Sequence, residues 1–113
     1  MARSTKVESV EKALTIKDRF SLLGILPKQG DIITMMMVRD IETKVVITPA
    51  EKEKHNFRKR EGGGGWQWDL PQERRTFTFS IAEMELVRAQ IVDLDRQKKV
   101  NADLLDFCIL MRE

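Results

Sequence analysis

The chain has 113 residues, of which 34% are charged and 42% hydrophobic, and its formal net charge is only +2. This length suits one domain that folds without metal or disulfide support, and the small net charge excludes the strongly basic field of histone-like and ribosomal proteins. The first residues lack the apolar stretch of a signal peptide, and no run of about 18 apolar residues occurs, so we expect neither export nor a membrane span. The single cysteine, Cys108, lies in an apolar run, which favours a core position and a reducing cytoplasm.

The N-terminal segment is polar and predicts a flexible arm. Over residues 1–14, Val7, Val10 and Leu14 form only a sparse helical stripe, too little to hold the segment against a core. We expect that a partner could order this arm. The remainder, residues 15–113, is predicted to be a single globular domain.

Two helices joined by a short linker are predicted next. The first covers residues 16–26, between a start signal at Thr15 and a stop at Pro27. The second covers residues 31–47, where apolar side chains recur every three or four positions. Because the linker between them is short, the two helices should form an antiparallel hairpin.

The helix over 31–47 is the longest segment that is apolar on more than one face. Its apolar positions are Ile32, Ile33, Met35, Met36, Met37, Val38, Ile41 and Val45. A helix that is apolar over so much of its circumference needs neighbours on two sides, so we expect it to be the central helix. Its three adjacent methionines favour the core, with self-association as the alternative, because one side of the helix would then be buried only in an oligomer.

The sequence changes character at residues 48–51, where Thr-Pro-Ala-Glu has the capping box and the first-turn proline of a new helix. The charged segment 51–60 is read either as a turn or two of solvated helix or as the root of a loop. Four glycines follow at 62–65. They predict a loop tip rather than a phosphate-binding loop, because Trp66 comes next instead of a lysine with a serine or threonine.

Two short strands and two helices complete the prediction. Residues 66–70 and 76–79 show the alternation of a small antiparallel β pair, with both phenylalanines of the second strand facing inward. A capping box at 80–83 begins a helix over 81–98, and a last helix follows over 102–111. The predicted fold class is therefore α+β, mostly α: a helical hairpin, a glycine-containing loop with a short β-hairpin, and two further helices.

The order of these elements resembles small, uncharacterised proteins encoded by bacteriophages and prophages. The resemblance rests on a helix ending near Leu26-Pro27, the apolar helix with Arg39-Asp40-Ile41, the Thr48-Pro49-Ala50-Glu51 start, the tryptophan-bearing loop, the Phe79-Ser80-x-x-Glu83 start and a short closing helix. It spans most of the chain from Leu22 onward and carries no catalytic or binding residue. It implies an accessory protein of a bacterial cytoplasm or a virion, of the kind that modulates larger host or viral machines.

The residues argue against an enzyme, a cofactor and a metal. One histidine and one cysteine cannot supply a zinc site. His55 lies among Lys52, Lys54, Arg58 and Lys59, whose positive charge opposes the protonated form that a catalytic base must pass through. The carboxylates are expected at helix starts or on solvated faces, where capping and solubility explain them.

The strongest candidate for a binding site is a basic loop that carries both tryptophans. The predicted partner-binding residues are Arg58, Lys59, Arg60, Trp66, Trp68, Arg74 and Arg75. Cations neutralise phosphates and aromatic rings stack on unpaired bases, for about 1–3 kcal/mol per base, while tryptophan and arginine are also enriched at protein-binding hot spots. A third interpretation is structural, with the tryptophans covering the helices.

Acidic residues within the same loop dilute its positive field, which favours a protein partner over nucleic acid. The sequence therefore predicts a non-enzymatic accessory or modulator protein that binds a host or viral protein and self-associates. The alternative is a nucleic-acid or nucleotide-binding module that uses the same loop.

Overall fold

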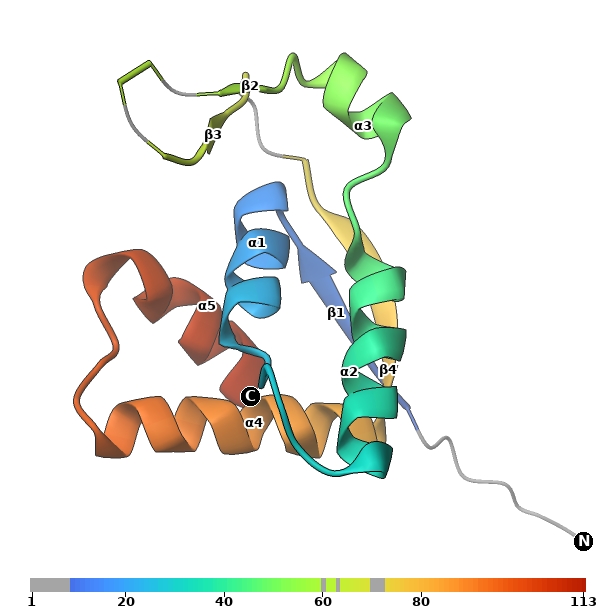
Figure 1. Cartoon of the computed structure of the whole chain (residues 1–113), viewed down its shortest axis with the longest axis vertical. Helices are drawn as coiled ribbons and strands as arrows, with labels where there is room; N and C mark the ends of the chain where they lie inside the picture. Colours follow the sequence, from blue (N-terminus) through green and yellow to red (C-terminus); the bar gives the residue numbers. More distant parts are fainter. Residues whose placement is uncertain (1–8, 60, 63, 70–72) are drawn as a thin grey trace, which may run out of the picture.

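The structure is a computed structural model that describes residues 9–59, 61–62, 64–69 and 73–113 (Figure 1). Its elements are β1 (Ser9–Leu14), α1 (Ile16–Ile25), α2 (Ile32–Val45), α3 (Pro49–Lys54), β2 (Arg58–Lys59), β3 (Trp66–Gln67), β4 (Arg75–Ser80), α4 (Ile81–Arg96) and α5 (Ala102–Arg112). The chain runs down α1 and back along α2, as the predicted hairpin requires (Figure 1). The fold is α+β and mostly helical, which confirms the predicted class.

A two-stranded antiparallel ribbon joins β1, near the start of the chain, to β4, which lies between β3 and α4 in the sequence. Its register pairs Val10 with Phe79 and Lys12 with Phe77. Both phenylalanines are buried, as predicted. The prediction of a flexible arm is wrong for Ser9–Leu14, because these residues gain ladder hydrogen bonds from a strand far along the chain. Residues 1–8 of the predicted arm lie outside the described residues.

The two strands predicted to pair with each other have different partners. β3 pairs with β2, through Arg58 with Gln67 and Lys59 with Trp66. β4 instead pairs with β1. The predicted β-hairpin is therefore wrong in its pairing, because alternation along a segment identifies a strand but carries no information about its partner.

α4, rather than α2, is the helix on which the fold is assembled. It contacts α1, α2, α5 and both strands of the ribbon, and it buries Met84, Val87 and Ile91 (Figure 1). α2 buries only its C-terminal half, whereas its first turns are exposed. The expectation of a central α2 is therefore wrong, because apolar composition around a helix does not determine how many neighbours it has.

One hydrophobic core lies between the ribbon and the helices. Its largest members by element are Leu14 of β1, Leu22 and Leu26 at α1, Ile41 and Val45 of α2, Phe77 and Phe79 of β4, Met84, Val87 and Ile91 of α4, and Phe107 and Met111 of α5. Two cations close this core at the end of α5, where helical carbonyls have no partner within the helix. Lys12 Nζ donates to the Leu110 carbonyl at 2.8 Å, and Arg88 Nε donates to the Met111 carbonyl at 3.2 Å.

The helix starts follow the predicted capping residues. Thr15, Thr48 and Ser80 each form a capping box with the acidic residue three positions later, and Asp31 and Asn101 cap α2 and α5. α4 ends at Arg96 rather than near residue 98, because Lys98 adopts a left-handed φ of 59°. The Lys98 amide donates to the Asp95 carbonyl, and the Lys99 amide donates to the Leu94 carbonyl. These are the two hydrogen bonds of a Schellman motif.

Candidate functional site

The predicted binding loop is anchored to α1 by an aromatic cluster. Trp68 stacks on Phe57 with ring centroids 5.4 Å apart and an interplanar angle of 15°. Its ring also lies 5.5 Å from that of Phe20 in α1, and Phe20 lies 6.0 Å from Phe57. Ring pairs of this kind contribute about 0.5–1.5 kcal/mol each beyond the area they bury. Trp68 therefore has a structural role in holding the loop.

The indole nitrogen of Trp68 adds nothing to this anchoring. Nε1 is shielded from solvent, and it has no hydrogen-bond acceptor among the described residues. A buried donor without an acceptor costs about 1–3 kcal/mol. The ring is consequently held by packing against the two phenylalanines and not by a polar contact.

A tight turn after α3 brings Phe57 into the aromatic cluster. Asn56 adopts a φ of 52°, a left-handed conformation that asparagine tolerates better than most residues. The amides of Asn56 and Phe57 donate back to the carbonyls of Glu53 and Lys52, which ends the helix. The Asp69 amide then donates to the His55 carbonyl at 2.8 Å, so the two ends of the loop are tied together.

Three arginines of the predicted site form ion pairs within the chain. Arg58 Nη1 lies 3.1 Å from Asp69 Oδ1, Arg74 Nη1 lies 3.7 Å from Asp18 Oδ2, and Arg75 Nη1 lies 3.6 Å from Glu51 Oε2. Lys54 of the same region pairs with Glu73 at 2.9 Å. Each cation thus has a carboxylate beside it, which lowers the positive potential that a phosphate backbone would meet.

The remaining predicted residues are distributed along the loop. Lys59 is exposed in β2, opposite Trp66 of β3. Arg60 and the side chain of Trp66 lie outside what the structure describes. The structure brings Arg58 and Trp68 into one loop, but it places Arg74 and Arg75 at the start of β4, beside α1 and α3.

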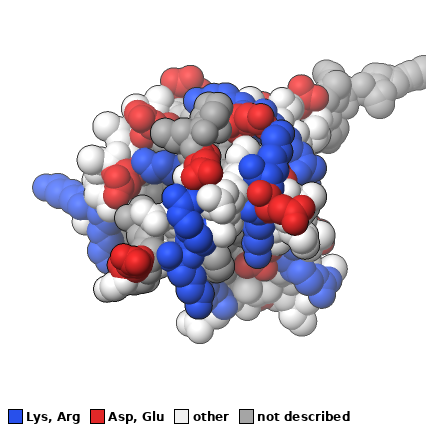
Figure 2. Space-filling view, turned by 90° about the horizontal axis from the view of Figure 1, so that it is seen from above, with Lys and Arg blue, Asp and Glu red and all other residues white. Residues whose placement is uncertain are grey.

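Seen from above α3 and the loop, basic and acidic side chains lie next to one another over the surface (Figure 2). This mixture agrees with the ion pairs and with the small net charge of +2. A face that binds nucleic acid without sequence preference usually presents a continuous basic track instead. The charge pattern of this face is therefore mixed.

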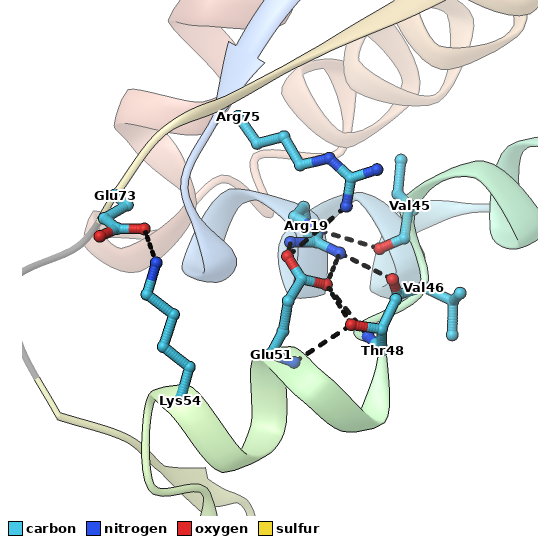
Figure 3. A network of polar contacts seen from close by, with 8 residues as sticks. All are labelled: Arg19, Val45, Val46, Thr48, Glu51, Lys54, Glu73 and Arg75. Atoms are coloured by element: carbon cyan, nitrogen blue, oxygen red, sulfur yellow. Dashed lines mark hydrogen bonds and ion pairs between the residues drawn. The ribbon is translucent and has the colours of Figure 1, made fainter.

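Sequence reasoning missed the most buried charge in the molecule, Arg19 of α1. Only 1% of Arg19 is exposed. Its Nη1 and Nη2 donate to both carboxylate oxygens of Glu51 at 2.7 and 2.9 Å, and its Nε and Nη2 donate to the carbonyls of Val45 and Val46 (Figure 3). The available signal was its position on the buried stripe, three residues after Ile16 and three before Leu22.

Glu51 receives hydrogen bonds from two directions. The Arg19 guanidinium, aided by hydrogen bonds from Thr48, lowers the pKa of Glu51 from an ordinary 4.5 to about 2. Arg75 approaches the same carboxylate (Figure 3). The guanidinium carbons of Arg19 and Arg75 each lie 5.0 Å from the centre of the Phe77 ring. This network joins α1, α2, α3 and β4, and each guanidinium nitrogen of Arg19 donates a hydrogen bond within the chain, so it is a structural centre.

The described residues include no group of three or more His, Cys, Asp or Glu side chains arranged to hold a metal ion. Burial raises the pKa of the Cys108 thiol, which belongs to α5 and lies in the hydrophobic core. None of the helices among the described residues combines the length and apolarity needed to cross a membrane.

Two apolar surfaces remain exposed. The α2 patch consists of Ile32, Ile33 and Met36, which are 79%, 70% and 50% exposed. The α4–α5 groove has a volume of about 410 Å³ and is rimmed by Val92, Leu105 and Ile109, which are likewise exposed. Apolar side chains gathered in this way mark contact surfaces more often than scattered ones do.

Comparison with known proteins gives no family assignment. No protein-family model matches the chain, and no curated protein or solved structure is significantly similar to it. The phage context implied by the order of the elements therefore stays a prediction.

Proposed function

We propose that this chain is a non-enzymatic accessory or modulator protein that binds a partner protein through the α2 patch. The observation that carries the proposal is the exposure of Ile32 and Ile33, more than two-thirds each, on an ordered helix start. Burying one isoleucine side chain contributes about 1.5–3 kcal/mol, so two of them with Met36 supply the apolar centre of a hot spot.

The capped start of α2 also limits the conformational entropy that is lost on binding. The Asp31 side chain accepts a hydrogen bond from the Thr34 amide at 2.7 Å, which fixes the first turn. A preformed turn loses little conformational entropy when a partner docks. Because Asp31 is exposed beside the isoleucines, the partner surface expected here is an apolar recess with a basic rim. The resemblance to phage proteins points to a component of a bacterial or phage machine.

The nucleic-acid alternative has less support. Arg58, Arg74 and Arg75 have carboxylate neighbours. Trp68 packs on Phe20 and Phe57 rather than offering a free face for base stacking.

Affinity capture from a bacterial lysate, followed by mass spectrometry, tests the proposal. Three baits are compared: the unmodified chain, the double variant Ile32→Ser with Ile33→Ser, and a matched control. The control is Val46→Ser, which changes an exposed apolar residue just after the same helix. We expect a protein that the unmodified chain and the control retain to be lost with the double variant.

The competing outcome is measured with nucleic acid itself. Tryptophan fluorescence is titrated with mixed-sequence single-stranded and duplex nucleic acid at low and high salt. Saturable quenching that weakens steeply with salt, together with unchanged capture by the double variant, would overturn the proposal in favour of nucleic-acid binding.

A further inference from the structure

α5 has a second, largely apolar stripe, which borders the α4–α5 groove and is exposed. Ala102, Leu105, Ile109 and Arg112 are all exposed and are spaced three, four and three residues apart. This is the spacing that keeps side chains on one face of a helix and that forms the seam of a helix pair. Phe107, Cys108 and Met111 are the residues that α5 buries against the rest of the fold. α5 is therefore apolar on two faces, and only one of them is covered by the described residues.

The α4–α5 groove lies along this stripe and has opposite charges at its two ends. Arg88 of α4 reaches the Met111 carbonyl, so Arg112 lies at the Arg88 end of the groove. Asp95 is almost two helical turns further along α4, at the Leu105 end. Within the described chain, neither Asp95 nor Arg112 forms an ion pair.

We propose that α5 packs antiparallel against α5 of a second copy of this chain, across a two-fold axis close to Phe107. In this register Leu105 of each copy lies opposite the partner's Ile109, and Arg112 lies opposite the partner's Ala102, whose small side chain leaves it room. The same rotation carries Arg112 to the end of the groove that holds the partner's Asp95. The contact between Arg112 and the partner's Asp95 therefore forms twice, as an interface with two-fold symmetry requires.

The charge arrangement selects a second copy as the occupant. A groove that is acidic at one end and basic at the other is complementary to itself after a two-fold rotation. The antiparallel arrangement also places the opposite ends of the two helix dipoles side by side. The α2 patch lacks this property, because its apolar residues occupy one end of α2 and the exposed residues that follow include Arg39, Asp40 and Glu42.

The seam is short, which limits the expected affinity of the dimer. α5 has 11 residues, about 16 Å of helix. A standard protein interface buries about 1,600 Å² in total, more than two helices of this length provide on their own. The dimer is therefore expected to form at micromolar concentrations and to dissociate on dilution.

Sedimentation velocity over a concentration series tests the proposal directly. We expect the mass to rise from 13.1 kDa towards twice that value. Leu105→Ser with Ile109→Ser should raise the dissociation constant of the dimer at least about a hundredfold, because the two substitutions remove apolar area from the seam. Ile32→Ser with Ile33→Ser is the matched control and should dimerise normally. Circular dichroism and urea unfolding verify that each variant is folded.

A charge exchange tests the register without removing apolar packing. Arg112→Glu alone and Asp95→Arg alone should each weaken the dimer roughly tenfold, because like charges then meet at both ends. The chain with both changes should recover an affinity within about threefold of the original, since the pair is restored in reverse.

Two outcomes would overturn the proposal. One is a constant mass of 13.1 kDa up to the solubility limit of the unmodified chain. The other is a dimer that survives both the α5 serines and the charge exchange but is lost with the α2 serines. Either result leaves partner capture through the α2 patch to be judged separately, because that experiment measures the retention of a lysate protein and not the mass of this chain.

Discussion

Arg19 of α1 and Glu51 of α3 are 32 positions apart and form a bidentate ion pair, with donor–acceptor distances of 2.7 and 2.9 Å. The Arg19 side chain is 2% exposed and that of Glu51 is 21% exposed. Breaking a buried pair by removing one partner costs more than the pair itself contributes, because a charge is left without compensation.

The first prediction concerns this pair. Glu51→Gln should lower the free energy of unfolding by about 2–3 kcal/mol, since the amide keeps the shape but leaves the Arg19 guanidinium without its counter-charge. Urea unfolding at neutral pH measures the loss. Glu73→Gln is the control: it removes the charge of an exposed pair with Lys54 and should change stability by less than about 1 kcal/mol. Equal losses in the two variants would contradict the assignment of Arg19–Glu51 as the structural centre.

The pH dependence of stability follows from the same carboxylate. Its pKa is about 2 in the folded chain against an ordinary 4.5, so the unfolded chain binds the proton more readily. The contribution of Glu51 is therefore complete above the unfolded value and is lost as the pH falls through about 2. The stability gap between the unmodified chain and Glu51→Gln should narrow progressively in acid. A gap that stays constant from neutral pH down to pH of about 2 would show that the carboxylate titrates normally.

Trp68 supports the loop through its ring, and the predicted effect of substitution depends on ring size. Trp68→Ala should cost roughly 2 kcal/mol and increase hydrogen exchange over residues 56–69, because contacts with Phe20 and Phe57 are lost. Trp68→Phe should retain most of the stability, since Nε1 has no acceptor among the described residues. If phenylalanine proves as damaging as alanine, a polar contact of the indole must be important.

Lys98 is predicted to be a site where stability can be gained. Its φ of 59° places a side chain where the backbone favours glycine. Lys98→Gly should therefore raise the free energy of unfolding by about 0.5–1 kcal/mol, whereas Lys98→Ala keeps the Cβ and should give no gain. Thermal unfolding of the two variants makes the comparison, and a gain with alanine instead would point to relief of charge rather than of backbone strain.

The features that were predictable from the sequence are local ones. A capping box needs only residues three positions apart, so the helix starts at Thr15, Thr48 and Ser80 could be read directly. The end of α4 was placed too late because Lys98, unlike glycine, gives no sign of a left-handed turn. A local feature such as a cap or a left-handed turn can be predicted from the sequence only when the residue type at that position is typical of it.

The features that were missed depend on contacts between distant segments. The pairing of β1 with β4 joins residues about 70 positions apart, and nothing within Ser9–Leu14 identifies its partner. The exposure of Ile32 likewise follows from where α2 lies against the ribbon and α4, not from its own composition. Trp68 and the site arginines were noticed for their residue type, but their carboxylate and aromatic neighbours come from other elements.

The pairing of β1 with β4 has a consequence for synthesis on the ribosome. Every element from α1 to β3 lies between these two strands in the sequence, so the sheet closes only after Ser80 has been added. Until then Leu14 and the buried face of α1 have neither β4 nor α4 to cover them. Contacts of such high sequence separation slow folding, since the loop between them must be closed first. The nascent chain should therefore stay largely unfolded through its first two-thirds and fold late, once α4 and then α5 have been added.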